Sequence, residues 1–313
     1  MAVTSVRTIS LLGLTGSLVD IEVDISDGLP IYTLLGLPDT ALMESKDRIR
    51  AALINSGESW PNRKVTVSLT PAWLPKSGSN FDLPIAVGLL RVQSLIPISD
   101  SQSEVLIGEL GLDGQIRPVR GVLPALLSAK KNGITRAIVP AENYQEASLV
   151  TDLEVLGFSN LKQLLIYLRT GEKFEAPQLA LEIEDSISTN DLSEISGQSV
   201  ARSALEIAAI GGHHLLFVGP PGTGKTMLAQ RVPGILPQLT NEQALEVTAI
   251  HSIAGNLTSG KLLTKQPPFV SPHHTTTATA MVGGGSHVIK PGAVSLAHNG
   301  VLFIDEAPEC NSG

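Results

Sequence analysis

The sequence predicts an α/β protein in two parts, and three observations support this. In the first half, β-like runs at residues 18–25 and 65–69 alternate with helical stretches such as residues 40–56. In the second half, a continuous apolar run leads into a glycine-rich loop and then a helix. A short acidic segment separates the halves. We therefore expect a mixed α/β domain followed by a domain built on a parallel sheet.

The acidic segment, residues 171–194, predicts an interdomain linker. It holds seven of the 30 acidic residues and one of the 22 basic residues. We expect residues 1–170 to form the N-terminal domain and residues 195–313 to belong to the second domain. Because neither large part has an excess of basic residues, composition predicts no surface for the phosphate backbone of nucleic acids.

Composition favours a globular, cytoplasmic protein. Of the 313 residues, 42% are apolar, which is enough to fill the cores of about two domains. No run approaches the roughly 18 apolar residues of a membrane helix, and the N-terminus has no cleavage signature, so we expect no membrane partner. The single cysteine, Cys310, excludes an internal disulfide and a cysteine-rich zinc site.

The elements expected after the linker surround the glycine-rich loop. Residues 200–210 have helical spacing and are followed by two glycines that predict a stop. Residues 214–218 predict the strand that enters the loop, and residues 225–232 predict a helix that Pro233 ends. A second apolar strand, residues 301–304, precedes two acidic residues. Both strands are expected to be buried on two faces, as in a parallel sheet.

The glycine-rich loop matches the whole P-loop pattern G-x-x-x-x-G-K-[ST]. It consists of Gly219, Pro220, Pro221, Gly222, Thr223, Gly224, Lys225 and Thr226. Its glycines let successive backbone N–H groups surround phosphate oxygens, and the following helix adds its positive end. Lys225 is expected to neutralise the β- and γ-phosphates and the Thr226 hydroxyl to bind magnesium. The loop therefore predicts ATP and Mg²⁺ as ligands.

Asp305 and Glu306 follow the second apolar strand. Acidic residues often cap buried strands, but together with a P-loop they predict a second chemical role. We expect Asp305 to hold Mg²⁺, through water, and Glu306 to act as the catalytic carboxylate that polarises the water attacking the γ-phosphate.

Three longer stretches resemble AAA+ ATPases of the magnesium-chelatase-like ComM/YifB family. They are residues 197–229, residues 271–276 (SPHHTT) and residues 290–309. The resemblance implies a partial P-loop AAA+ domain in which Ile195 and Gly197 lie near the adenine and residues 282–291 project toward a ring pore. For the complete family member it implies self-association into a ring, expected to be a hexamer. It also implies an ATP-driven motor that acts on DNA in branch migration and natural transformation.

The N-terminal part resembles the proteolytic domain of Lon over residues 74–90 and 107–143. Lon-type cleavage needs a serine nucleophile and a lysine that deprotonates it. By alignment, the serine position falls at or near Asn80, with Ser77 and Ser79 close by, and the lysine position falls at Leu123. Leucine cannot act as a base, so we expect a Lon-like domain that binds or scaffolds without protease activity.

The sequence ends at Gly313, seven residues after Glu306. The resemblance implies that an AAA+ core continues through two further strands, sensor residues, an arginine finger and a helical lid. Residues 214–218 would lie between those two strands. We therefore expect a truncated product in which residues 195–313 hydrolyse ATP poorly or not at all.

Two other functions stay open at this point. One is a metal-insertion motor like the magnesium-chelatase subunit, and the other is a nucleotide-binding or scaffold remnant without turnover. His273 and His274 are adjacent, so in an extended segment they would point to opposite faces, and a shared metal site is not expected. A plain loop role and a family-specific role both remain possible for this pair.

Overall fold

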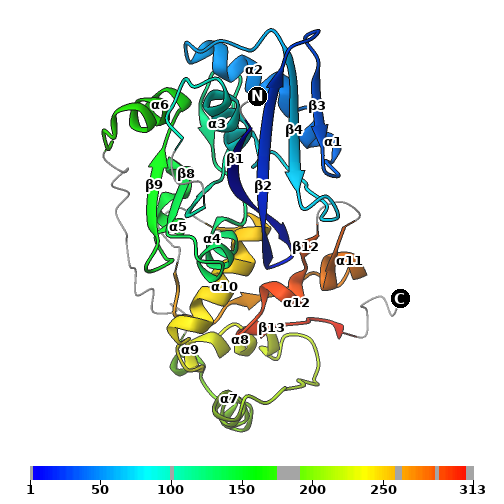
Figure 1. Ribbon diagram of the computed structural model, residues 1–313. Coiled ribbons are helices and arrows are strands. Elements are labelled where there is room, and N and C mark those ends of the chain that lie inside the picture. Colours follow the sequence, from blue (N-terminus) through cyan, green and yellow to red (C-terminus); the bar gives the residue numbers. More distant parts are fainter. Residues whose placement is uncertain (1–2, 99–101, 175–190, 258–262, 286–288, 308–313) are drawn as a thin grey trace. The chain divides into compact units, whose positions relative to one another are not determined.

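The computed structural model describes residues 3–98, 102–174, 191–257, 263–285 and 289–307 (Figure 1). The chain separates into two compact units, Met1–Ala180 and Leu181–Gly313. Most of the predicted linker, residues 171–194, lies outside the described residues. Both units combine helices with strands, and both contain parallel strand pairs, as the predicted α/β class requires.

A four-stranded sheet with the order β1-β2-β4-β3 forms one layer of the first unit (Figure 1). The strands are β1 (Thr4–Leu12), β2 (Thr15–Ser26), β3 (Tyr32–Leu35) and β4 (Lys64–Thr70). β2 pairs antiparallel with β1 and β4, while β3 runs parallel to β4. Alternate residues of β2 (Val19, Ile21 and Val23) are buried. The strands predicted at residues 18–25 and 65–69 are therefore confirmed.

Helix α3 (Asp82–Val92) forms the centre of this unit and packs against β1 and β2. It is apolar nearly all round, which is the pattern of a core helix rather than a surface helix. Gly88 permits the close packing, since a Cβ atom there would lie 2.8 Å from Val23 Cγ2. The helix predicted over residues 40–56 is confirmed as α1 (Thr40–Met43) and α2 (Ser45–Asn55), with a break at Glu44.

A second, fully parallel sheet of the first unit has the order β5-β8-β9. Its strands are β5 (Glu104–Leu106), β8 (Arg136–Pro140) and β9 (Glu154–Phe158). The remaining elements are a hairpin of β6 (Glu109–Leu110) and β7 (Ile116–Arg117), helices α4 (Val122–Lys131), α5 (Tyr144–Ala147) and α6 (Leu161–Thr170), and a short 3₁₀ turn, Ala141–Asn143.

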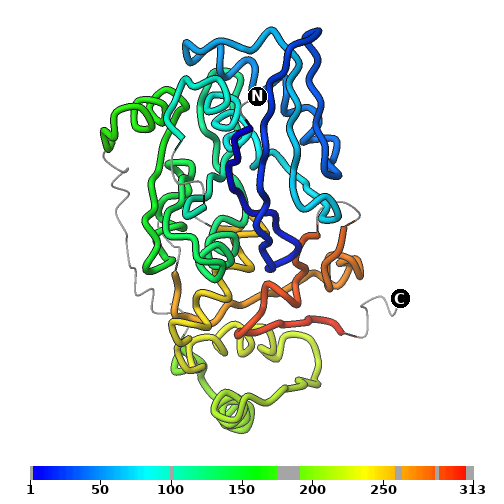
Figure 2. Tube along the Cα trace, viewed as in Figure 1, coloured from blue at the N-terminus to red at the C-terminus, as the bar shows by residue number. Residues whose placement is uncertain are grey.

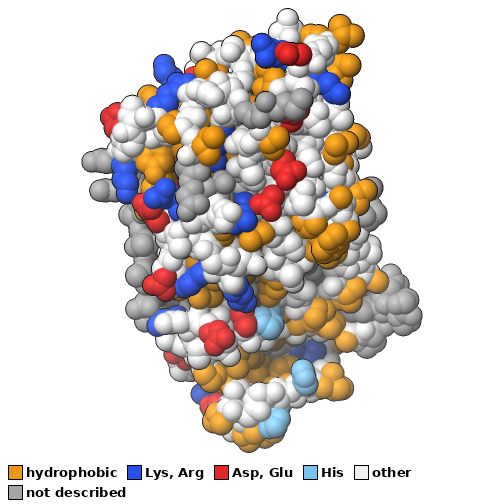
Figure 3. Space-filling model, viewed as in Figure 1, with side chains coloured by type: hydrophobic (Ala, Val, Ile, Leu, Met, Phe, Trp, Pro, Cys, Tyr) orange, Lys and Arg blue, Asp and Glu red, His pale blue; other side chains and the backbone are white. Residues whose placement is uncertain are grey.

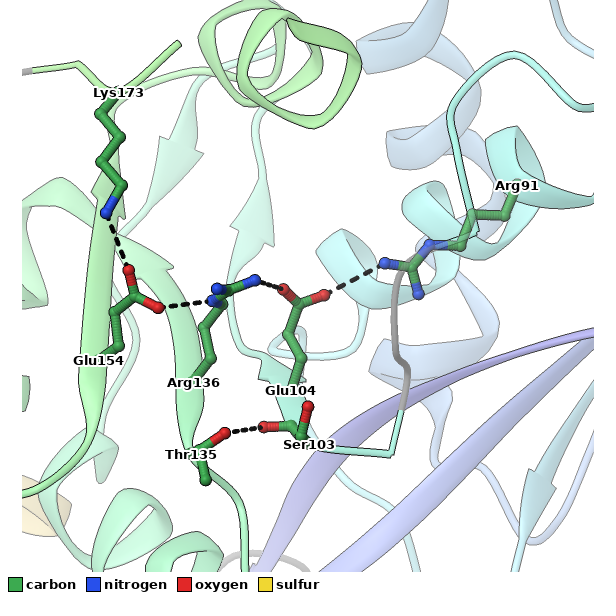
Figure 4. Close-up of polar contacts among 7 residues, drawn as sticks. All are labelled: Arg91, Ser103, Glu104, Thr135, Arg136, Glu154 and Lys173. Carbon is green, nitrogen blue, oxygen red and sulfur yellow. Dashed lines mark hydrogen bonds and ion pairs between the residues drawn. The ribbon is translucent and has the colours of Figure 1, made fainter. Parts of the chain in front are cut away.

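Charged side chains form a chain of ion pairs across the second sheet (Figure 4). Arg91 Nη2 lies 3.1 Å from Glu104 Oε1, and Arg136 Nη1 lies 3.9 Å from Glu104 Oε2. Arg136 Nε also lies 2.8 Å from Glu154, whose other oxygen is 3.0 Å from Lys173 Nζ. This series of ion pairs begins at a buried pair, Arg91 and Glu104, and ends at exposed Lys173, so one network spans the core and the surface.

The second unit has short strands and a larger proportion of helix than the first unit. The helices are α7 (Ser199–Gly211), α8 (Lys225–Ala229), α9 (Val232–Ile235), α10 (Asn241–Ala254), α11 (Ala278–Val282) and α12 (Ala293–Leu296), with a 3₁₀ turn at Leu192–Glu194. β10 (Phe269–Val270) pairs parallel with β13 (Val301–Leu302), and β11 (Gly283–Gly284) pairs antiparallel with β12 (Lys290–Pro291). Helix α7 confirms the predicted helix, and Gly212 ends it at φ +63°.

The strand predicted at residues 214–218 is wrong. This segment runs as an irregular, extended loop between α7 and α8 (Figure 2). Leu216 and Val218 are 82% and 89% exposed, so the apolar run is not buried either. Among the strands that the structure describes, none pairs with this segment, and a β-strand forms only where its backbone N–H and C=O groups find partners in a neighbouring strand.

Two neighbouring predictions need smaller corrections. The helix expected over residues 225–232 ends at Ala229, and Pro233 lies in the first turn of α9 instead of ending α8. Proline is tolerated there because the first turn does not need its backbone N–H. The strand expected at residues 301–304 is limited to Val301–Leu302 and is half-buried, not buried on both faces.

Candidate functional site

The P-loop connects the irregular segment to α8 and contains two glycines in the left-handed region. Gly222 has φ +78° and Gly224 has φ +81°. Residues with a Cβ atom rarely adopt such angles, so both positions favour glycine. Gly224 precedes Lys225, the first residue of α8, and therefore turns the chain into that helix.

Side chains of the P-loop fold back on the loop's own carbonyl groups. Lys225 Nζ donates to the carbonyl oxygens of Gly219 and Pro220 at 2.9 and 3.0 Å. The Thr223 hydroxyl also donates to the Pro220 carbonyl, at 2.9 Å. The lysine amine is thus held against the carbonyl groups of its own loop, and its predicted role in binding phosphate stays a prediction.

Thr226 and Asp305 come together although 79 positions separate them in the chain. The Thr226 hydroxyl donates to Asp305 Oδ2 at 3.0 Å. Thr226 lies in the first turn of α8, and Asp305 follows β13, so the contact joins the helix after the P-loop to the end of a strand. Both groups offer oxygen atoms, which are the ligands that Mg²⁺ prefers. The pair fits the predicted metal-binding role.

The residues expected near adenine differ in their surroundings. Ile195 is 2% exposed and belongs to a small core with Leu192, Leu205 and Leu228. Gly197 has φ +78°, and a Cβ atom there would meet no neighbour within 4 Å. The next residue, Gln198, was not singled out from the sequence, yet its side chain donates to the Thr223 carbonyl. The turn before α7 is therefore hydrogen-bonded to the P-loop.

Glu306 contacts a histidine that sequence reasoning did not assign to the site. His274 Nδ1 lies 3.2 Å from Glu306 Oε2. The rings of His273 and His274 are 4.0 Å apart, centroid to centroid, because the chain turns at His274. The expectation that the two side chains point to opposite faces is therefore wrong. It assumed an extended backbone, which the turn replaces.

The segment expected to project toward a pore, residues 282–291, folds back on itself through β11 and β12. Residues 286–288, between these strands, lie outside the described residues. Gly292, just after β12, packs tightly against this pair, since a Cβ atom there would lie 2.2 Å from the Gly283 nitrogen.

Two of the positions considered for protease chemistry in the first unit, and the nearby Lys76, serve other contacts. The Ser79 hydroxyl donates to Glu109, and the Asn80 amide donates to the Ile9 carbonyl at 3.3 Å. Lys76 is 1% exposed, and its amine donates to the carbonyls of Leu69 and Pro71. Burial lowers the pKa of Lys76.

Comparison with known proteins places this sequence in a family. The family described as "Magnesium chelatase, subunit ChlI" matches residues 191–313, and the one described as "Subunit ChlI of Mg-chelatase" matches residues 21–143. Over 309 residues, the chain is 50% identical to an uncharacterized protein of Mycobacterium tuberculosis and 43% identical to the uncharacterized protein YifB of Escherichia coli. It is also 43% identical over 316 residues to the competence protein ComM of Haemophilus influenzae.

The chain belongs to the ComM/YifB family of magnesium-chelatase-like proteins. Each of these matches covers 99% of the chain, and the chain in turn covers 61%, 60% and 61% of the three relatives. The chain therefore spans about three-fifths of the length of the family members that it matches.

The chain has a second likeness. Lon protease 2 of Bacillus subtilis is 26% identical to the chain over 114 residues, which is 36% of the chain and 20% of the protease. Together with the family matches, this fits a Lon-like part followed by an AAA+ part. Within the described residues, no helix has the length and apolar character needed to cross a lipid bilayer.

Proposed function

We propose that residues 195–313 of this ComM/YifB family chain bind ATP with Mg²⁺. The P-loop, Gly219 to Thr226, binds the phosphates, and Thr226 and Asp305 hold the metal ion. The observation that carries this proposal is the hydrogen bond between Thr226 and Asp305. It brings together the P-loop hydroxyl and the strand-end carboxylate that a P-loop site requires around the same ion.

The chain's own groups have distinct tasks in this site. Backbone N–H groups of the loop and the amine of Lys225 bind phosphate oxygens, and Lys225 exchanges its carbonyl partners for the β- and γ-phosphates. Mg²⁺, when bound, neutralises charge that develops on the phosphates. Ile195 and Gly197 lie near the adenine, and the hydrogen bond from Gln198 to the Thr223 carbonyl links this segment to the P-loop.

Glu306 supplies the proton acceptor for hydrolysis in this proposal. The carboxylate takes a proton from a water molecule as the water oxygen bonds to the γ-phosphorus. The bond between that phosphorus and the bridging oxygen breaks, and its electron pair leaves with ADP. Glu306 then releases the proton, so the products are ADP, inorganic phosphate and one proton.

Calorimetric titration of the 313-residue chain with ATP tests the binding proposal. We expect saturable binding with Mg²⁺ that weakens about 10-fold or more in Lys225→Ala, a loss of at least about 1.4 kcal/mol. Lys265→Ala is the matched control, because Lys265 is an exposed lysine of the same unit outside the site. Equal affinities for Lys225→Ala and the unchanged chain would overturn the proposal.

For longer family members, we infer that this ATP site drives a ring-shaped motor that acts on DNA. The name of ComM, a competence protein, and the resemblance described above support DNA as the partner. The description of the matching family supports metal insertion instead. Filter binding of single-stranded, duplex and forked DNA by a longer member, over a range of salt concentrations, separates the two. Absence of ATP-dependent DNA binding or remodelling would exclude the DNA role.

We also infer that the first unit binds or scaffolds without cleaving peptides. Leu123 is fully buried and has no basic group, and the Ser79 hydroxyl donates a hydrogen bond to Glu109. A casein or fluorogenic-peptide digest with the 313-residue chain is expected to show no cleavage. Cleavage that Ser79→Ala abolishes would overturn this inference.

A further inference from the structure

Arg231 lies between α8 and α9, and its guanidinium has three hydrogen-bond acceptors around it. Its Nε donates to the Asp191 carbonyl oxygen at 3.0 Å, and its Nη2 donates to Glu194 Oε2 at 2.8 Å. Its Nη1 donates to the carbonyl oxygen of Met227, within α8, at 3.0 Å. One planar guanidinium therefore fastens residues 191–194 to the helix that begins at the P-loop.

These contacts are partly withdrawn from water. The Arg231 side chain is 12% exposed, whereas that of Glu194 is 50% exposed. Arginine presents its N–H groups in a rigid fork, and charge-assisted hydrogen bonds are about twice as strong as those between neutral groups. Arg231 therefore restrains this segment more strongly than a fully exposed ion pair would.

The apolar packing of the same segment is small. Leu192 and Ile195 are its buried side chains, and within the described residues they share a buried core with Leu205 and Leu228. Arg202 Nη1 also donates to the Ile195 carbonyl oxygen, at 3.2 Å. Segments with few buried apolar contacts open locally at low cost, so hydrogen bonds from arginine have a large share in holding this one.

The segment also reaches the P-loop itself. The Gln198 side chain donates to the carbonyl oxygen of Thr223, in the P-loop. Residues 191–198 are thus attached to the end of α8 through Arg231 and to the P-loop through Gln198. Ile195 and Gly197, the residues proposed to lie near the adenine, come between these two attachments in the chain.

We propose that Arg231 is a positioning residue that lets the base of ATP add to the binding of its phosphates. The guanidinium holds residues 191–198 in place beside the P-loop before the nucleotide arrives, so that binding does not have to order them. This inference rests on the proposed function and deepens it, because it names the group that aligns the base-binding segment with the phosphate-binding loop. Without Arg231, the phosphates bind as before and the contribution of the base is lost.

Four variants test this proposal: Arg231→Ala, Glu194→Ala, the two combined, and Lys265→Ala. Arg231→Ala removes all three hydrogen bonds, whereas Glu194→Ala removes one acceptor. Lys265→Ala is the control, since Lys265 is exposed and lies outside the site. Thermal unfolding of each variant verifies that it folds. If Arg231→Ala does not fold, the half-exposed Glu194 still provides the test.

Calorimetric titrations in Mg²⁺ compare ATP with inorganic triphosphate, which has no base or sugar. We expect Arg231→Ala to weaken ATP binding about 10-fold or more and to change triphosphate binding less than about two-fold. Glu194→Ala should weaken ATP binding about three-fold and leave triphosphate binding unchanged. The double variant should bind ATP no more weakly than Arg231→Ala does. A residue that only stabilised the P-loop would affect both ligands together.

Amide hydrogen exchange gives a second measurement, without nucleotide. Peptides that cover residues 191–198 should exchange faster in Arg231→Ala than in the unchanged chain, while peptides that cover α8 should keep their rates. Lys265→Ala should leave both sets of rates unchanged.

Three results would overturn the positioning role. They are equal weakening of ATP and triphosphate binding in Arg231→Ala, an ATP affinity that this variant leaves unchanged, and unchanged exchange over residues 191–198. Each of them leaves the proposed function standing as long as Lys225→Ala weakens the binding of both ligands. Absence of that dependence on Lys225, or of any ATP binding by the unchanged chain, would overturn the proposed function and the role of Arg231 together.

Discussion

Arg48 and Asp82 form a two-pronged ion pair in the first unit, with Arg48 Nε 2.7 Å from Asp82 Oδ2 and Nη2 3.1 Å from Oδ1. The aspartate side chain is fully buried, while that of Arg48 is 22% exposed. Arg48 also donates to the Ala41 carbonyl at 2.9 Å. The pair therefore joins α1, α2 and the start of α3, the central helix.

Asp82 should make the stability of the first unit depend on pH. Burial raises the pKa of Asp82 to about 6, although Arg48 opposes the rise. The folded chain then binds the proton more tightly than the unfolded chain, whose aspartate pKa is about 4. The resulting stabilisation is present below about pH 4 and is lost as the pH rises through about 6. As the pH rises from about 4 to above 6, the unchanged chain should therefore lose about 2–3 kcal/mol of stability that Asp82→Asn does not lose.

Urea unfolding at several pH values measures this change. Trp60 and Trp73, the two tryptophans of the chain, both lie in the first unit, so their fluorescence reports its unfolding. Glu154→Gln is a control of opposite sign, because Lys173 and Arg136 lower the pKa of Glu154. Its carboxylate contributes stability that is lost as the pH falls through the folded pKa. Parallel pH profiles for Asp82→Asn and the unchanged chain would contradict the prediction.

Glu104 should be the critical member of the ion-pair chain in Figure 4. It is 3% exposed and faces the fully buried Arg91, so Glu104→Gln removes the charge that compensates a buried guanidinium. We expect it to lower the free energy of unfolding by about 3 kcal/mol. Lys173→Ala, at the exposed end of the same series of ion pairs, should lower the free energy of unfolding by less than about 1 kcal/mol. Equal losses in tryptophan-detected urea unfolding would argue against this ranking.

Gly36 should tolerate no side chain. It has φ +107°, and a Cβ atom there would lie 2.3 Å from the Leu69 carbonyl oxygen of the neighbouring strand. We expect Gly36→Ala to destabilise the first unit by about 3 kcal/mol, from backbone strain and overlap together. Gly57, at φ +89°, has nothing within 4 Å of its Cβ position. Gly57→Ala isolates the strain and should cost about 1 kcal/mol. The difference between these two losses of stability measures the cost of the overlap at Gly36.

Local sequence pattern was sufficient to predict the elements whose signal comes from their own residues. The β-like runs at residues 18–25 and 65–69 predicted β2 and β4, and helical spacing predicted α7, because each signal depends only on neighbours in sequence. Residues 214–218 carry an equally apolar signal and yet form no strand. A strand needs hydrogen-bonding partners from elsewhere in the chain, and apolar composition does not supply them.

The candidate site, too, was predicted only in part from the sequence. The P-loop spacing identified Lys225 and Thr226, and the apolar run before Asp305 and Glu306 identified the acidic pair; their roles remain predictions. His274 was missed, because its contact with Glu306 depends on the pairing of β10 with β13. Two residues four positions beyond paired strand positions are visible as neighbours only when the register is known.

Thr226 should determine how strongly magnesium supports nucleotide binding. Its hydroxyl and the Asp305 carboxylate are 3.0 Å apart, and both would bind the ion. Thr226→Ala removes one oxygen ligand, so the gain in ATP affinity on adding Mg²⁺ should shrink by about 10-fold. Thr226→Ser keeps the hydroxyl and should retain the gain. Titrations with ATP in magnesium and in EDTA provide the comparison, since affinities in EDTA should be similar for all three chains. If Thr226→Ala kept the full magnesium dependence, the hydroxyl would have no part in binding the metal, and Asp305 would have to act without it.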